Sequence, residues 1–327
     1  CADAPTTEIK ATRNKSIINR FKKIVGITSA VDSNAKLSGD CLVRATEQKI
    51  KIPLEQLFKE LPLTPLSELL KNGENLLDYQ QTPVKRFLQF ANIHHRSLLE
   101  IGADDAILLS QFVLKGMRRG FGVNSWYWDH KTIKTVKASY QIILSYGDIR
   151  DLPLEDGDFD LIFSVAAFEH IHELDVALKE MYRLLKPGGL VYSHFGPLWS
   201  SGIGHHLFFE RKGQWHRFTE EESTLPILGN YEHLLFDREQ MTLKLQTRWE
   251  PKDVDCFIYE LYDNPHINRY MYADYLRMFN ASPFQVIHLQ NVGKTHLDPE
   301  VHEQLRMKFG PDNDFSCATL EVMLKKP

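Results

Sequence analysis

The sequence predicts an α/β fold with a doubly wound, mostly parallel sheet, and two observations carry this prediction. From Ser97 onward, short apolar runs that end in glycine or a polar residue alternate with segments of helical periodicity. Alternating strands and helices require crossover connections, which are right-handed and give parallel strands with helices on both faces. The 327 residues are enough for one such domain with an added segment.

Residues 1–90 have a different character. After a polar start that we expect to be frayed, apolar residues recur at helical spacing. Pro53 and Pro83 suit first helical turns, and Gly73 suits a helix end. Helices are expected over 16–25, 52–61, 66–73 and 82–93. We interpret residues 1–90 as a helical N-terminal lid region and residues 91–327 as the core domain.

The core elements follow in a regular order. Strands are expected over 97–102, 120–124, 141–148, 159–165 and 190–195. Helices are expected over 106–117 and 172–186. Strands of this length that alternate with helices are typical of repeated strand–helix–strand units.

Polar residues fall at the carboxyl ends of these strands, where open α/β sheets bind ligands. They are Glu100, Asn124, Asp148 and Ser164. Gly102 would let the backbone approach a ligand closely. An amide at Asn124 suits a ribose hydroxyl, and a carboxylate at Asp148 suits an adenine amine. A dinucleotide is not favoured, because no GxGxxG follows the first strand.

Three segments resemble the class I S-adenosylmethionine-dependent methyltransferases. They are "LLEIGADDA" (98–106), "YGDIRDLPLEDGDFDLIFSVAAFEHI" (146–171) and "EMYRLLKPGG" (180–189). Residues 267–289 and 317–327 resemble the late helix, late strand and final strand of the same family. The resemblance implies S-adenosylmethionine as methyl donor and S-adenosylhomocysteine as product.

The resemblance also implies roles for individual residues. Glu100 and Gly102 would lie against the methionine part of the cofactor, and Asn124 would take the ribose hydroxyls. Asp148 and Ile149 would meet the adenine, and Ser164 would form the floor beneath the sulfonium.

The chain departs from the family pattern at two positions. Asp104 stands where the family usually has a second glycine, and Asn124 stands where it usually has an acid. Asparagine still hydrogen-bonds a ribose. Asp104 narrows the loop and adds a negative charge, which would face the amino group of the cofactor. The pair Glu169–His170 is commonly structural in this family, although it resembles a catalytic dyad.

An insertion over about 196–265 separates the fifth strand from the late helix, and it would leave the sheet over the cofactor. We expect it to form a lid over the acceptor, with His205, His206 and His233 as catalytic candidates. Adjacent histidines diverge on a helix or strand, so one of the pair with His233 is as plausible as both together.

Three interpretations of these histidines stay open. They could bind a divalent metal (iron, manganese, zinc or cobalt) that stabilises an enolate. One could be the general base for a hydroxyl. They could also be ordinary packing within the insertion.

A narrower resemblance, to a methyltransferase domain of a polyketide synthase, implies a carrier-protein-bound malonyl-type acyl acceptor and other domains of a larger synthase as partners. The chain begins at Cys1, which fits a domain of a longer polypeptide. The alternatives are a metal-independent O-methyltransferase of a sugar or secondary metabolite, and a scaffold module without catalysis.

Composition excludes other classes of function. The net charge of −4 argues against nucleic-acid binding, which depends on neutralising phosphates. No apolar run approaches the roughly 20 residues that span a bilayer. The four cysteines are scattered and form no CxxC pair, which favours a reducing, cytoplasmic setting.

Overall fold

The computed structural model describes residues 51–60, 76–125, 137–138, 141–211, 214–216, 218 and 226–327. Within these residues one large sheet has the strand order β3-β4-β2-β1-β5-β6-β10-β9. The bounds are β1 Ser97–Ile101, β2 Arg119–Asn124, β3 Lys137–Ala138, β4 Ile142–Tyr146, β5 Phe159–Val165, β6 Leu185–Phe195, β9 Gln285–Lys294 and β10 Cys317–Lys325. The helices predicted over 16–25 and 66–73 lie outside the described residues.

The sheet is mostly parallel, as predicted. Strands β4, β2, β1, β5 and β6 run in one direction, whereas β10 is antiparallel to both β6 and β9. The short strand β3 is antiparallel to β4. From β1 the chain first builds outward through β2 and β4, and it then returns to place β5 on the other side of β1. The topological switch point therefore lies between β1 and β5, where such folds bind ligands.

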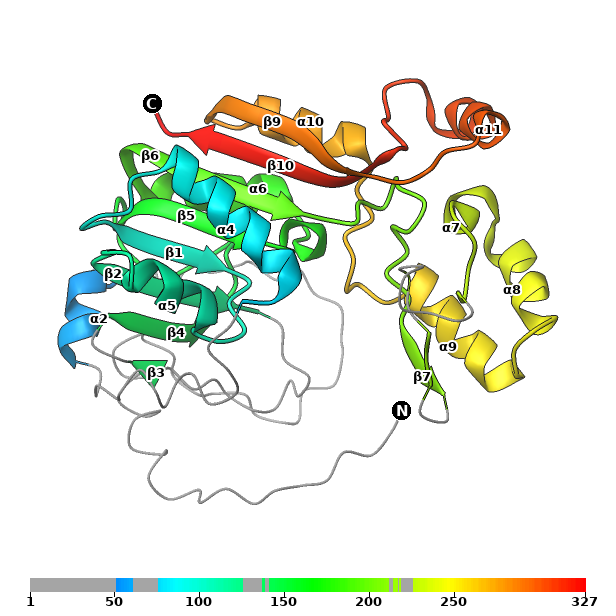
Figure 1. Cartoon of the computed structure of the whole chain (residues 1–327), viewed down its shortest axis with the longest axis horizontal. Helices are drawn as coiled ribbons and strands as arrows, with labels where there is room; N and C mark the ends of the chain where they lie inside the picture. Colours follow the sequence, from blue (N-terminus) through cyan, green and yellow to red (C-terminus); the bar gives the residue numbers. More distant parts are fainter. Residues whose placement is uncertain are drawn as a thin grey trace, which may run out of the picture.

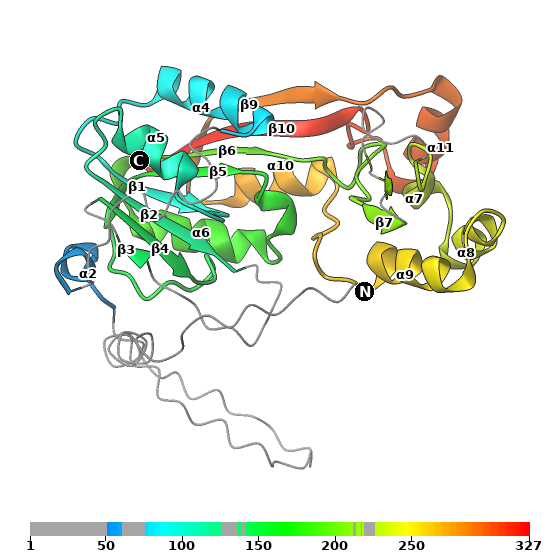
Figure 2. The ribbon, with the colours of Figure 1, turned by 60° about the horizontal axis from the view of Figure 1, so that its bottom comes forward.

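Helices cover both faces of the sheet (Figures 1 and 2). Helices α4 (Asp78–Phe90) and α5 (Ile107–Val113) lie on one face, and α6 (Leu174–Leu184) and α10 (Tyr272–Ala281) lie on the other. Phe87 of α4 packs against Phe112 of α5 and Phe163 of β5 on the first face. Helix α2 (Leu54–Glu60) follows Ile52, which bridges to Leu154 at the edge of the core.

Several predicted boundaries were wrong by a few residues, and the starts of α4 and β6 have a clear physical reason. Helix α4 begins at Asp78 and contains Pro83, because the Gln80 side chain accepts a hydrogen bond from the Leu77 backbone N–H and so fixes an earlier start. Strand β6 begins at Leu185 and not at residue 190, because Leu185 already pairs with Phe159.

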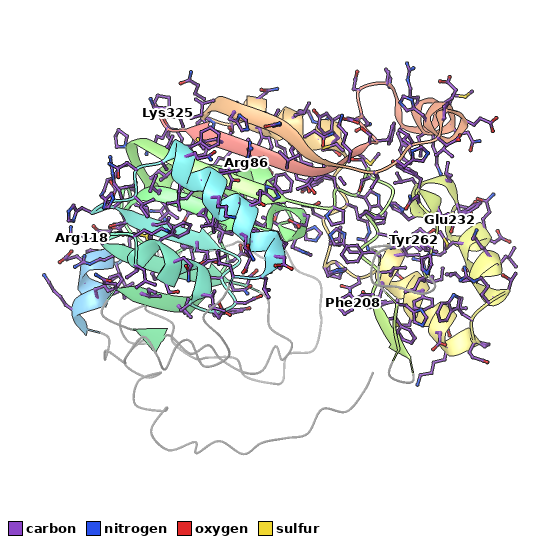
Figure 3. The ribbon with its side chains drawn as sticks, viewed as in Figure 1. Arg86, Arg118, Phe208, Glu232, Tyr262 and Lys325 are labelled. Carbon is purple, nitrogen blue, oxygen red and sulfur yellow. The ribbon has the colours of Figure 1, made fainter. Side chains whose placement is uncertain are left out.

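The segment between β6 and α10 builds a unit beside the sheet. It contains β7 (Phe209–Arg211), β8 (Gln214–His216), α7 (Glu232–Leu235), α8 (Arg238–Gln246) and α9 (Pro251–Tyr262). Leu207, Met241, Leu245, Phe257 and Leu261 belong to its own apolar core. Helices α7, α8 and α9 lie on the side to which the arrowheads of β1 and β5 point (Figure 1). Phe208, Glu232 and Tyr262 are labelled in this unit in Figure 3.

A buried charge network joins α4 to the far strands of the sheet. Glu321 of β10 is fully buried, and its carboxylate accepts hydrogen bonds from Arg86 and Tyr192 at 2.5 and 2.6 Å. His288 of β9 contacts the same carboxylate at 2.9 Å. Arg86 reaches toward β10 from α4 (Figure 3). After β9, helix α11 (Pro299–Phe309) packs beside α7.

Among the described residues, no helix has the length and apolar character that crossing a membrane requires.

Candidate functional site

The loop after β1 folds tightly over the end of β2. The backbone N–H groups of Gly102 and Ala103 both donate to the Val123 carbonyl, at 2.9 and 3.1 Å. Gly102 has a φ of +86°, and a Cβ placed there would lie 2.8 Å from the Cβ of Ala167. A side chain at this position would therefore be strained and would meet the segment after β5.

Two buried polar atoms lie next to this loop on adjacent strands. Glu100 is almost fully buried and its Oε2 has no hydrogen-bond partner, and the same holds for the hydroxyl of Ser164. Burial raises the pKa of Glu100 well above its usual value, and Asp105 and Asp104 raise it further. Unpartnered buried polar atoms are uncommon and indicate a place where a ligand or water completes the hydrogen bonding.

Asp104 and Asn124, the two departures from the family pattern, contact each other. The Asn124 side-chain amide donates a hydrogen bond to the Asp104 carboxylate. Partial burial raises the pKa of Asp104 and Asp105 raises it further, whereas Asn124 and His170 lower it. The contact between Gly102 and Ala167 places the end of β5 close to this loop.

Asp148 carries an ion pair. Its carboxylate accepts hydrogen bonds from Arg150 at 2.6 and 2.9 Å, and Arg150 also reaches Glu173 at 2.6 Å. Ile149 is buried. The predicted contacts of Asp148 and Ile149 with an adenine stay predictions.

The histidine-rich part of the site lies at the ends of β5 and β6. Glu169 and His170 belong to the short 3₁₀ helix η1 (Phe168–His170), and His206 lies in the loop after β6. One potential ligand atom of each of these three residues lies within 4.8 Å of the other two. We call Glu169, His170 and His206 the ligand triad.

Hydrogen bonds fix the tautomers of both triad histidines. Nδ1–H of His206 donates to the Gly204 carbonyl at 2.8 Å, and Nδ1–H of His170 donates to the His266 carbonyl at 2.7 Å. The lone pair of each ring is therefore on Nε2, and Nε2 of His206 is buried without a partner. Glu169 accepts from the Gly196 N–H at 3.1 Å through Oε1, while its Oε2 is also buried and unpartnered.

Burial sets the charge states of these groups. It lowers the pKa of His206 to about 3, with a smaller contribution from His170. The pKa of Glu169 is raised by burial, and His170 partly offsets this. The His266 ring lies 5.6 Å from that of His170, and burial lowers the pKa of His266 to about 4. His206 and His266 are therefore neutral near pH 7, and the neutral imidazole is the form that binds metals.

The backbone around the triad explains its convergence. His206 has a φ of +51°, and Gly204 donates to the Ser201 carbonyl at 3.1 Å in the preceding turn. A Cβ at Gly204 would lie 2.2 Å from the Leu198 carbonyl oxygen, so this turn requires glycine. Asn268 holds η1 from the other side. Its side-chain amide donates to the Phe168 carbonyl at 2.7 Å, and its backbone N–H donates to the Glu169 carbonyl at 2.9 Å.

The three predicted insertion histidines divide into two groups. His206 joins Glu169 and His170, whereas the rings of His205 and His233 lie 5.4 Å apart. His205 accepts from the Leu207 N–H at Nδ1, and His233 donates to the Trp199 carbonyl at 2.9 Å. Burial lowers the pKa of His233 to about 4 and that of His205 well below its usual value. Roles of His205 and His233 as metal ligands or catalytic residues stay predictions.

Sequence reasoning set aside Glu169 and His170 as structural. The available signal was their place directly after β5, at the predicted ligand edge. Their meeting with His206 depends on the left-handed turn at His206, which residue types alone did not indicate.

Comparisons with known proteins concern mainly the first part of the sheet. Residues 99–193 match the model of a methyltransferase domain. The chain is 50% identical over 54 residues to a malonyl-[acyl-carrier protein] O-methyltransferase of Methylococcus capsulatus. These residues make up 16% of this chain and 20% of that protein. It is 27% identical over 96 residues to a probable S-adenosylmethionine-dependent methyltransferase of Mycolicibacterium smegmatis. Those residues make up 29% of this chain and 36% of that protein.

The matched region thus spans between about a fifth and a third of the length of these relatives. Among solved structures, an S-adenosylmethionine-dependent methyltransferase from Mesorhizobium loti aligns with 78% of this chain and 99% of its own length, at 12% identity and a TM-score of 0.44.

Proposed function

Because the chain carries a class I S-adenosylmethionine-dependent methyltransferase domain, we propose that it methylates a carbon or oxygen of a small, oxygen-rich acceptor with the help of a divalent metal. We call the carboxyl ends of β1, β2 and β5, with the loop after β1, the cofactor edge. The convergence of Glu169, His170 and His206 beside this edge carries the proposal. Gly102 in the loop after β1 lies against Ala167, two residues before Glu169, so the triad and the cofactor edge are neighbours.

The donor set of the triad suits a metal. Two imidazoles with one carboxylate are typical ligands for iron, manganese, cobalt or zinc. The buried, unpartnered Oε2 of Glu169 and Nε2 of His206 each need a partner that the described residues do not supply. Backbone carbonyls that accept from the other nitrogen of each histidine are the support that metal-binding imidazoles usually have.

The chemistry of methyl transfer gives the metal a use. A carbon between two carbonyls reacts only as an enolate, and a divalent metal stabilises that enolate as a Lewis acid. Within the chain, the Gly204 and His266 carbonyls would hold both imidazoles in the ligating tautomer. Glu169 would supply the negative charge of the donor set.

We infer that the acceptor is a malonyl-type acyl group delivered by a carrier protein. A relative named for action on malonyl-[acyl-carrier protein] supports this, although the match is short. The segment 196–265 would act as the acceptor lid, with His205 and His233 as contacts for the acceptor. Other domains of a larger synthase would be partners.

The metal-independent alternative uses a lid histidine as general base toward a hydroxyl. The low pKa values of His205, His206 and His233 argue against it, since an efficient base titrates near the working pH.

A transfer assay tests the proposal. The protein is incubated with S-adenosylmethionine and either malonyl-pantetheine or a hydroxyl acceptor, and products are followed by mass spectrometry. We expect a gain of one methyl group on the malonyl carbon, its loss with chelator and its recovery with manganese or iron. The assay is repeated with Glu169→Gln, which alters a residue of the triad. His296→Asn, at an exposed histidine, is the control for this variant. Methylation that continues in excess chelator would contradict the metal, and no transfer to either acceptor would contradict the acceptor class.

A further inference from the structure

Asp104 and Asn124 occupy one corner of the cofactor edge, and their backbone surroundings limit what can meet a ligand there. The N–H groups of Gly102 and Ala103 are already used by the Val123 carbonyl. Asn124 is the last residue of β2, and Asp104 follows β1 by three residues. Ligand hydroxyls at this corner would therefore be met by side chains.

The two side chains have complementary hydrogen-bonding capacities. The Asn124 amide donates to Oδ1 of Asp104, which orients the carboxylate. Oδ2 of Asp104 accepts no hydrogen bond from any residue that the structure describes, and Asp104 is exposed. Asp105, the neighbouring acid, is engaged differently, because its Oδ1 accepts from the Ile107 N–H at 2.8 Å at the start of α5.

We propose that Asp104 and Asn124 act as one unit that binds the ribose hydroxyls of the cofactor, with the Asp104 carboxylate as the acceptor and Asn124 as the residue that positions it. An acid beyond a sheet strand that accepts from ribose hydroxyls is a general solution in nucleotide-binding α/β folds. In this chain the acid has moved from the end of β2 to the loop after β1. The two departures from the family pattern thus compensate each other.

This assignment differs from the expectation that Asp104 faces the amino group of the cofactor. Glu100 already offers a buried, unpartnered carboxyl oxygen on β1. The hydrogen bond from Asn124 instead ties Asp104 to the end of β2. The inference rests on the proposed cofactor, so its test begins with cofactor binding.

The test is calorimetric titration with two probes, S-adenosylhomocysteine and 5′-methylthioadenosine. The second probe keeps the adenine and ribose but lacks the amino acid part. Asp104→Asn should weaken both probes by the same factor, about tenfold or more, because a hydrogen bond to a charged group is lost. Asp105→Asn is the matched control and should leave both affinities unchanged. The swap Asp104→Asn with Asn124→Asp should recover most of the loss, because it keeps one carboxylate and one amide in the corner.

Three results would overturn the assignment. A loss of affinity for S-adenosylhomocysteine alone would place Asp104 at the amino group. Unchanged affinities in Asp104→Asn would show that Asp104 does not bind the ribose. A swap variant that binds the probes as weakly as Asp104→Asn would show that the two side chains do not act as one unit. If the unaltered protein binds neither probe, the proposed function itself fails, and this inference fails with it.

Discussion

At the scale of single residues, backbone geometry decides what the site can hold. The left-handed turn at His206 brings that ring to Glu169 and His170, while His205 lies against His233. The sequence identified His206 as a candidate ligand, because paired histidines in a glycine-rich stretch are unusual. It did not identify the partners of His206, since they lie in a distant segment and meet it only through the fold.

Gly102→Ala tests the close approach of the β1 loop to the segment after β5. We expect a loss of about 1–3 kcal/mol in the free energy of unfolding, from left-handed strain and the contact with Ala167. Denaturant titration measures it. Gly188→Ala is the control, because Gly188 has a φ of +77° but no atom within 4 Å of an added Cβ. Equal losses in the two variants would contradict a role for close packing at Gly102.

At the scale of elements, apolar runs predicted the parallel strands well because each run is buried and short. Strand β5 was found with its observed limits, Phe159–Val165. The starts of α4 and β6 were predicted too late. Pro83 was taken as the first turn of a helix that a local hydrogen bond starts earlier, and the pairing of Leu185 with Phe159 joins distant segments. No helix or strand was predicted within 196–265, where the described structure has two strands and helices α7, α8 and α9.

Arg86→Ala tests the charge network that joins α4 to β10. Glu321 is fully buried, and the removal of Arg86 leaves its negative charge without the arginine that pairs with it. We expect a loss of about 3–5 kcal/mol in the free energy of unfolding. Arg118→Ala, at an exposed arginine 3.5 Å from Glu55, should change it by less than about 0.5 kcal/mol. Similar values for the two variants would show that the network does not stabilise the fold.

At the scale of the whole molecule, the resemblance to a family predicted the cofactor edge and the final strand, whereas periodicity alone predicted only strands and helices. The position of β10 between β6 and β9 depends on long-range pairing that no local pattern encodes. The described part of the chain also gathers five histidines, of which His205, His206 and His233 are buried, and this collective property follows only from the fold. They are His170, His205, His206, His233 and His266.

Buried neutral histidines make the stability of the whole protein depend on pH. The pKa values of His206, His233 and His266 are lowered to about 3, 4 and 4, so each takes up a proton on unfolding below pH 6.5. Their stabilising contribution is present above pH 6.5 and is lost as the pH falls toward 4. Each proton adds a slope of about 1.4 kcal/mol per pH unit.

Urea titrations between pH 8 and pH 5, with chelator present, measure this slope. Glu100 and Glu169 act in the opposite direction because their pKa values are raised, so variants are needed to isolate the histidines. His233→Gln should flatten the slope, and His296→Asn should leave it unchanged. A slope that does not change in His233→Gln would contradict the buried neutral state of that histidine.

The most direct test of the central claim is the metal content of the protein, purified without chelator or affinity nickel and measured by elemental analysis. We predict near-stoichiometric iron, manganese, cobalt or zinc in the unaltered protein and in His296→Asn. The metal should be lost in Glu169→Gln and in His206→Ala, because each removes a ligand of the triad. A metal-free protein that still methylates its acceptor, or metal retained in both triad variants, would contradict the account.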